Sequence, residues 1–166
     1  MRRRNKIVVG ATSAVAATAI AAVPAGAGGD SVTGELGGDS AKRAPLVLDL
    51  IGTTANDTIT VSTFGGGVRA AVPAPATITG PPACDQDTPQ QFTCDATVGV
   101  DAVRGRMGPG GDRFNARQYT KLTNQYGGAG NDVLKGGTKF DFFNGQGGGN
   151  DRCRGGRGKE TLKKCE

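Results

Sequence analysis

The chain has 166 residues with a formal net charge of +5, 29 glycines, two tyrosines, six phenylalanines and no tryptophan or histidine. The lack of histidine excludes a Ser-His-Asp triad, a Cys-His nucleophile and any histidine-bound metal. So few aromatic residues argue against a large globular core, and the length suits a single domain.

The first 27 residues have the composition of a secretory signal peptide. A basic start, MRRRNK, is followed by an apolar stretch over residues 7–23 and by the small residues Ala25, Gly26 and Ala27. We expect cleavage after Ala27 and export of a mature protein that has no second apolar stretch and therefore no membrane span. The alternative is a retained membrane anchor, because the apolar stretch is at the lower edge of the length that crosses a bilayer.

The segments that follow predict a flexible leader over residues 28–44 and an irregular β-rich cap, or degenerate coils, over residues 45–106. The leader is rich in glycine and polar residues. The cap alternates turns with short runs rich in Val, Ile and Thr, which favour strands. These runs begin at Leu46, Asp57, Gly67, Thr77, Gln91 and Val98. Prolines at positions 73, 75, 81 and 82 predict loops or edge positions between them.

The four cysteines indicate two disulfides in an exported chain. Three pairings are possible. We expect the local one, Cys84 with Cys94 and Cys153 with Cys165, because it keeps each bridge within its own segment. The first bridge would close a hairpin, and the second would staple the end of the chain. A zinc site is the alternative, but the cysteine spacing and the lack of histidine fit it poorly.

Residues 127–135 read GGAGNDVLK and match the nonapeptide G-G-x-G-x-D-x-U-x, in which U is a large apolar residue, at every fixed position. Glycine permits backbone conformations that other residues resist. Asp132 offers the hard oxygen ligand that calcium prefers, and Leu134 gives a short strand an apolar side chain to bury.

Imperfect copies surround this nonapeptide. Three begin at residues 136, 146 and 155, with one extra residue, Gly145, between the first two, and weaker copies begin at residues 107 and 52. In chain order the acids are Asp57, Asp112, Asp132, Asp141, Asp151 and Glu160, and the apolar positions are Ile59, Phe114, Leu134, Phe143, Cys153 and Leu162. A Gly-rich flexible linker, the alternative, would not repeat an acid and an apolar residue together at this spacing. The period indicates a solenoid, whose units bury their apolar faces against each other.

Residues 127–163 resemble the RTX, or hemolysin-type, calcium-binding repeats, with weaker echoes from Met107 and Gly52. The resemblance implies an all-β fold with a parallel β-roll, a form of β-solenoid, at the C-terminal end, over residues 107–166. In such a roll each repeat supplies one turn and one short strand, and a pair of repeats completes a coil. Calcium then lies between turns stacked on the same side, bound by main-chain carbonyls and Asp carboxylates.

Because turns two repeats apart share a side of the roll, the resemblance pairs Asp132 with Asp151 and Asp141 with Glu160. We expect the first pair to be the better site, since the turns of the second pair each carry a lysine. Asp112 would complete a third site only if the turns between it and Asp132 are irregular. The implied calcium-site residues are these acids and the glycines of the first pair of turns: Asp112, Asp132, Asp141, Asp151, Glu160, Gly128, Gly130, Gly147 and Gly149.

The sequence therefore predicts a secreted, non-enzymatic calcium-binding protein whose folding is coupled to calcium. RTX proteases and lipases carry a separate catalytic domain, for which this chain has no room. The alternative is an extracellular adhesin or cell-wall module that binds anionic polymers, since residues 104–166 carry thirteen Lys or Arg against six Asp or Glu. Arg152, Arg154 and Arg157 are its candidate contacts. No nucleic acid partner is expected.

Overall fold

The computed structural model describes residues 31–38 and 45–166. The predicted signal peptide, residues 1–27, lies outside the described residues. Within them the chain is all-β and forms fourteen strands in two mixed sheets of seven strands each, with one 3-10 helix, η2 (Ala96–Val98). No helix in these two ranges is long and apolar enough to cross a membrane.

Each sheet extends from an edge strand near the C-terminus to an edge strand in the cap. In that order the first sheet consists of β14 (Glu160–Lys163), β12 (Asp141–Gly147), β10 (Leu122–Ala129), β8 (Ala102–Pro109), β2 (Val47–Ile51), β1 (Ser31–Gly37) and β5 (Thr77–Thr79). The second sheet consists of β13 (Arg152–Arg154), β11 (Val133–Lys135), β9 (Arg113–Gln118), β3 (Thr58–Phe64), β4 (Gly67–Ala71), β7 (Gln91–Cys94) and β6 (Asp85–Thr88).

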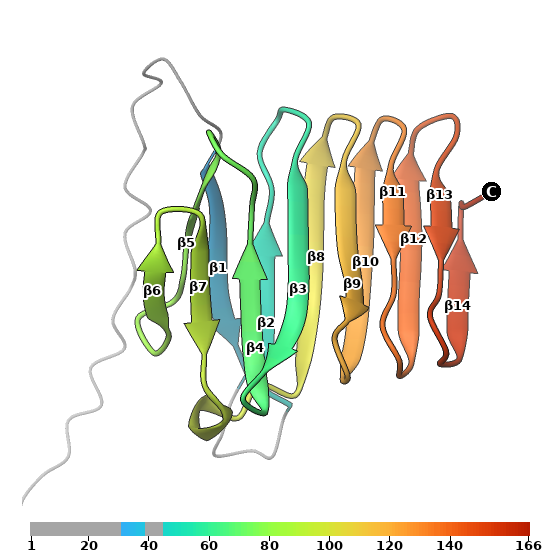
Figure 1. The fold of residues 1–166 in the computed structure, drawn as a ribbon. Coiled ribbons are helices and arrows are strands. Elements are labelled where there is room, and N and C mark those ends of the chain that lie inside the picture. The colour runs from blue at the N-terminus through green and yellow to red at the C-terminus, as the bar shows by residue number, and fades with distance from the viewer. Residues whose placement is uncertain (1–30, 39–44) are drawn as a thin grey trace, which may run out of the picture.

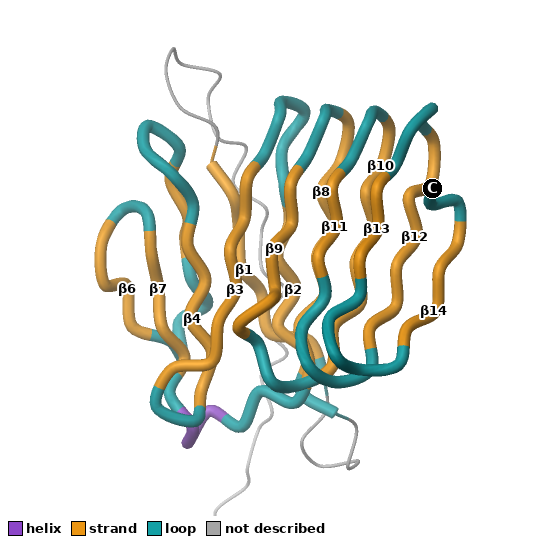
Figure 2. Tube along the Cα trace, turned by 45° about the vertical axis from the view of Figure 1, so that its right-hand side comes forward, coloured by secondary structure: helices purple, strands orange, loops and turns teal. Residues whose placement is uncertain are grey.

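From β8 to β14, consecutive strands belong to alternate sheets (Figures 1 and 2). Neighbours within each sheet are parallel in this region. Parallel neighbours need a crossover connection, and here a strand of the other sheet provides it. The cap is different, because β3, β4, β7 and β6 pair as antiparallel neighbours.

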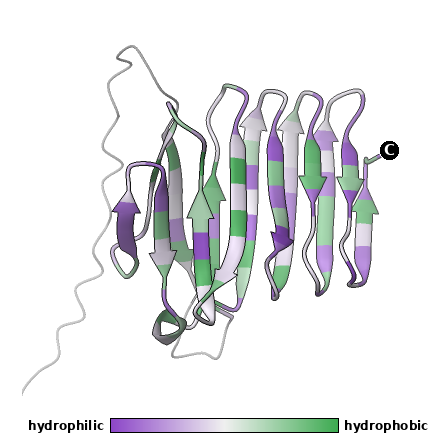
Figure 3. Ribbon diagram, viewed as in Figure 1, coloured by the Kyte–Doolittle hydropathy of each residue, from purple (hydrophilic) through white to green (hydrophobic). Residues whose placement is uncertain are grey.

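The apolar positions of the repeats fill the space between the two sheets. Ile59, Phe114, Leu134 and Phe143 are buried in one core that also contains Cys153. Polar residues alternate with apolar ones along the strands, which gives the banded colouring of Figure 3. This alternation is what a strand with one buried face requires.

Leu162 departs from this pattern. Its side chain was expected in the core but is 47% exposed. The reason is its position in β14, which is the edge strand of the first sheet. Within the described residues no later strand continues either sheet to cover it.

The leader prediction also needs correction. Ser31–Gly37, assigned to the flexible leader, forms β1, which pairs antiparallel with β2 and parallel with β5. Val32 and Gly34 face inward and Leu36 is half-buried, so the strand has an alternating pattern. Because the inward position between Val32 and Leu36 is a glycine, the sequence does not show a regular apolar alternation here.

Five of the predicted strands in the cap are confirmed as β2, β3, β4, β5 and β7. The prediction of a strand beginning at Val98 is wrong, because Val98 is the last residue of η2. Asp95 caps η2 by accepting a hydrogen bond from the backbone N–H of Thr97, and Gly99 ends the helix with a φ of 75°. The next strand, β8, begins only at Ala102.

The local disulfide pairing is confirmed. Cys84 is bonded to Cys94 and closes the β6–β7 hairpin, and Cys153 of β13 is bonded to Cys165 near the C-terminus. Disulfides persist in oxidising compartments, so the two bonds indicate an extracellular type of environment.

We expect the Cys153–Cys165 bond to stabilise the C-terminal strands selectively. Replacing both residues with alanine opens a loop with a sequence separation of 12. A loop of this length is worth about 3 kcal/mol in the chain-entropy model. Hydrogen exchange should therefore become faster at the amides of β11–β14 in this variant. It should stay unchanged there when Cys84 and Cys94 are both replaced with alanine, and equal effects of the two variants would contradict the assignment.

Candidate metal centre

Four aspartates form a column along the second sheet, which we call the aspartate column: Asp57, Asp112, Asp132 and Asp151. Each directly precedes a strand, β3, β9, β11 and β13 respectively, and each is buried. Oδ1 of Asp112 accepts a hydrogen bond from the backbone N–H of Asp57 at 2.7 Å. Oδ1 of Asp132 accepts one from Asp112, and Oδ1 of Asp151 accepts one from Asp132, each at 2.9 Å. The structure thus places Asp132 directly between Asp112 and Asp151.

The first glycine of each repeat makes room for the carboxylate of the same repeat. A Cβ added to Gly127 would collide with Oδ2 of Asp132. A Cβ added to Gly145 would collide with Oδ2 of Asp151. Neither glycine has a positive φ, so the constraint at this position is space rather than backbone conformation.

The second and fourth glycines have another role. Gly128 and Gly130 have φ values of 113° and 133°, in the region that favours glycine. A Cβ on either would also collide with the carbonyl oxygen of Gly108 or Gly110 in the preceding turn. These glycines let consecutive turns stack closely. The atoms that face them are backbone atoms of the preceding turn and not side chains.

The extra residue that the sequence predicted at Gly145 lies elsewhere in that turn. Gly145 takes the place of the first glycine, because the Asp151 carboxylate folds back against it. Gln146 then pairs with Gly128 and has a φ of 68°. A glutamine therefore occupies the place of the second glycine, in a conformation that L side chains rarely adopt.

Gly147 and Gly149, both predicted as calcium-site glycines, are not the ones that the stacked turns require. A Cβ on either would meet its nearest atom at an ordinary 3.8 Å. A Cβ on Gly148 would instead collide with the carbonyl oxygen of Gly130. The exposed segment 146–150 therefore absorbs the extra residue.

A second group of polar residues lies along the first sheet. Asp141 begins β12, with Glu160 of β14 and Thr123 of β10 as its neighbours in the parallel register. The hydroxyl of Thr123 donates to Oδ1 of Asp141 at 2.6 Å, and Nε2 of Gln125 donates to Oγ1 of Thr123 at 3.0 Å. Asp141 is buried, whereas Glu160 is exposed on the edge strand. The pair predicted from the sequence is thus adjacent, but one member lies in solvent.

Burial raises the pKa of two carboxyl groups in the aspartate column, those of Asp112 and Asp132. The pKa of Asp112 rises to about 6, mainly because burial removes the charged form from water. The hydrogen bond from the Asp57 amide opposes this rise, while the charges of Asp132 and Asp57 add to it. Burial likewise raises the pKa of Asp132, and the charge of Asp151 contributes to that rise. Asp112 and Asp132 therefore hold their protons more tightly than isolated aspartates do.

One oxygen of several buried carboxyl groups has no partner. Oδ2 of Asp112, Asp132 and Asp141 is buried and accepts no hydrogen bond within the described part of the chain. Burial also raises the pKa of Asp141. In the same part of the chain, no Lys or Arg forms an ion pair with these three acids. An unpaired buried carboxylate costs on the order of several kcal/mol, so a proton or a cation is stabilised here.

These oxygens fit calcium in kind, but the side chains alone do not complete a calcium shell. Calcium takes six to eight hard oxygen ligands. Among the described residues, no group of three or more His, Cys, Asp or Glu side chains could hold a metal ion. Main-chain carbonyls and waters would have to supply the remaining ligands. Some turn carbonyls already accept hydrogen bonds, such as Ala129 from Gly110 at 2.7 Å and Gly147 from Gly130 at 2.9 Å.

Asp57, Thr123 and Gln125 belong to these groups but were missing from the predicted site. Asp57 belongs to the faint copy GTTANDTIT, in which Gly52 holds the first glycine position. Thr53 replaces the second glycine, and its backbone N–H and Oγ1 donate to Oδ2 of Asp57 at 2.6 and 3.1 Å. The nonapeptide spacing within that copy was the available signal. No sequence signal pointed to Thr123, because its segment, LTNQYGGA, has no acid at the repeat position.

Comparisons of this chain with protein-family models, with curated proteins and with solved structures found no match. The resemblance to calcium-binding repeats therefore rests on the nonapeptide copies alone.

We expect Gly127→Ala to lower the free energy of unfolding by about 1–3 kcal/mol, the usual cost of overpacking a buried site. The new Cβ would displace the Asp132 carboxylate. Gly149→Ala is the matched control, since its Cβ has room. Urea unfolding should show a change within about 0.5 kcal/mol for that variant. Equal losses for the two variants would show that the carboxylate does not set the requirement for glycine.

The aspartate column also predicts a pH dependence in calcium-depleted buffer. The pKa of Asp112 is about 6 in the folded protein against an ordinary 3.8, so the folded state binds this proton more tightly. That stabilisation is complete below the unfolded-state pKa and is lost as the pH rises through the folded-state pKa. Asp112→Asn removes the titratable carboxyl group but keeps an oxygen that can accept the hydrogen bond from the backbone N–H of Asp57. The variant should therefore gain stability relative to the parent between pH 4 and pH 6.5, measured by urea unfolding.

The control for this titration is Asp85→Asn, which removes an exposed carboxyl group from β6. The difference in unfolding free energy between this variant and the parent should not follow the same curve. A difference between Asp112→Asn and the parent that is independent of pH would rule out the assigned titration.

Proposed function

We propose that this is a secreted, non-enzymatic calcium-binding protein whose C-terminal repeats form a parallel β-roll. Calcium would bind along the aspartate column, with Asp132 and Asp151 as the principal carboxylates and Asp112 as the next. Bound calcium supplies the positive charge that the buried carboxyl groups lack. The observation that carries the proposal is the unpartnered Oδ2 of Asp112 and Asp132 in turns that follow the calcium-binding nonapeptide.

The roll is supported by the order of the strands. From β8 onward each new strand joins the sheet opposite to its predecessor, and neighbours in both sheets are parallel. The turns between them contain the glycines and acids of the nonapeptide. The two disulfides support export, because such bonds are rare in reducing compartments.

Coupling between calcium and folding follows from the charge of the column. Without a cation, the folded protein either keeps protons on the column or holds adjacent carboxylates close together. The protonated state becomes less favourable near neutral pH, since the pKa of Asp112 is about 6, and this leaves the state with adjacent, repelling carboxylates. A ligand that binds only the folded state stabilises it by mass action. Calcium should therefore contribute most to stability above pH 6.

The test is urea unfolding at pH 7.5, followed by circular dichroism, in calcium and in a chelator. Calcium at 100 times its dissociation constant should raise the free energy of unfolding by about 2.7 kcal/mol. Magnesium should raise it less, because magnesium demands a tight octahedral shell and keeps its waters. Identical unfolding curves in calcium and chelator, with no calorimetric binding at millimolar calcium, would refute the proposal.

Single substitutions test which carboxylates bind the ion. Asp132→Asn keeps an oxygen that can accept the Asp112 amide, so it removes the charge and preserves the hydrogen bond. This variant should lose most of the stabilisation by calcium while remaining at least as stable as the parent in chelator. Glu160→Gln alters an exposed residue of β14 and should weaken the calcium effect less. The reverse order would place the principal site along the first sheet instead.

A further inference from the structure

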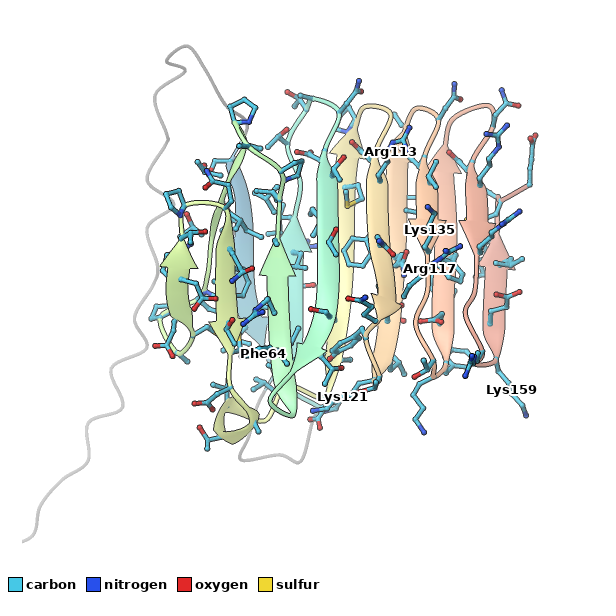
Figure 4. The ribbon with its side chains drawn as sticks, in the orientation of Figure 1. Phe64, Arg113, Arg117, Lys121, Lys135 and Lys159 are labelled. Atoms are coloured by element: carbon cyan, nitrogen blue, oxygen red, sulfur yellow. A yellow bond between two sulfur atoms is a disulfide. The ribbon has the colours of Figure 1, made fainter. Side chains whose placement is uncertain are left out.

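The outer face of the second sheet carries an unusual concentration of cations. A shallow groove of about 400 Å³ crosses β9, β11 and β13. Its charged lining residues, which together we call the basic groove, are Arg113, Arg117, Lys135, Arg152 and Arg154. Figure 4 shows Arg117 and Lys135 near one another and Arg113 above them toward the upper end of β9, while Lys159 lies at a lower turn toward the C-terminal edge.

The register of the parallel strands brings these cations together. Arg113, Val133 and Arg152 form one row across the three strands. Asn115, Lys135 and Arg154 form the next row. Arg113 and Arg152 are therefore two strand spacings apart, about 10 Å, and Lys135 is one spacing, about 5 Å, from Arg154. The residues between the rows point into the core, so all of the charged side chains are on the solvent side.

No acid neutralises this face within the described part of the chain. No Asp or Glu lines the groove, and none of its five cations forms an ion pair there. The acids of the same turns belong to the aspartate column and are buried. The outer face of the first sheet differs, because Asp49 lies 3.5 Å from Arg104 and 3.6 Å from Arg106.

Like charges on adjacent strands repel each other, so this arrangement lowers stability in the free protein. An anion that bridges neighbouring rows would relieve that repulsion. Arginine suits such a ligand, since its planar guanidinium binds a carboxylate or sulfate through two parallel hydrogen bonds. Four of the five cations are arginines.

We propose that the basic groove binds an acidic polysaccharide, with its carboxylate or sulfate groups on the arginine and lysine side chains and a sugar ring over Val133. Val133 is partly exposed at the centre of the first row and offers an apolar surface between two arginines. The groove is open to solvent across three strands, so a chain can lie along it. This site is on the opposite face of the strands from the core and does not use the aspartate column.

Other polyanions fit the groove less well. Single-stranded nucleic acids bind through aromatic stacking platforms as well as charge, and no aromatic residue lines the groove. Peripheral membrane binding needs a substantial apolar surface to enter the lipid interface, which Val133 alone does not provide. The disulfides also favour an extracellular polymer over an intracellular one.

The test uses the full disulfide-bonded protein in calcium, with immobilised heparin as a sulfated probe and polygalacturonate as a carboxylated probe. The variant Arg113→Gln/Arg152→Gln removes two groove cations. Its matched control is Arg157→Gln/Lys159→Gln, which removes two exposed cations outside the groove. Arg157 was a candidate contact from the sequence, but it does not line the groove. We expect about a tenfold or greater loss of affinity for the groove variant, as for the loss of two charge-assisted contacts. The control should change affinity by about twofold or less, because exposed charges outside a contact act mainly through screened long-range attraction.

Binding of either probe with this contrast supports the proposal, and the stronger probe identifies the acidic group. Equal losses for the two variants would indicate attraction by net charge alone and would overturn it. Binding to neither probe would also overturn it. So would binding to oligo-dT, or to vesicles of phosphatidylglycerol and phosphatidylcholine, that is tighter than binding to both polysaccharide probes. If the groove variant has an altered circular dichroism spectrum, Arg117→Gln/Arg154→Gln is judged by the same contrast.

Discussion

The structure depends on the burial of one carboxylate in each turn of the second sheet. One oxygen accepts the amide of the preceding aspartate, which holds consecutive turns together. The other oxygen, in Asp112 and Asp132, is buried without a partner in the described chain. The hydrogen-bonded oxygen fixes how consecutive turns stack. The unpartnered oxygen creates a need for a nearby positive charge. The first glycine of the repeat follows from the same burial, since a side chain at Gly127 would occupy the space of the carboxylate.

Burial of the acids also explains the charge of the surface. The C-terminal part of the chain carries thirteen basic and six acidic residues, and four of those acids are buried. The basic residues are mostly on the outer strand positions, where no acid is left to pair with them. A protein that is acidic inside its turns is therefore basic outside. The calcium proposal and the polysaccharide proposal concern these two sides of the same strands.

The nonapeptide period was sufficient to place Asp132 next to Asp151 and to predict five of the six repeat side chains that were expected in the core, all except Leu162. It could not place the extra residue near Gly145, because several glycines in succession allow more than one register. Only the three-dimensional contact between Gly145 and the Asp151 carboxylate distinguishes them. Strand β1 was missed for a related reason, since a glycine interrupts its apolar alternation. Thr123 joins Asp141 through tertiary register, and no local pattern records such a contact.

The central claim is that calcium replaces protons on the buried column, and the most direct measurement is calorimetry of calcium binding in buffers with different ionisation enthalpies. Because the pKa of Asp112 is about 6, calcium binding at pH 5.5 should release protons, and the observed heat should depend on the buffer. At pH 8 the release should fall toward zero while binding becomes tighter. Binding with no proton release at pH 5.5, or no binding at either pH, would contradict the account.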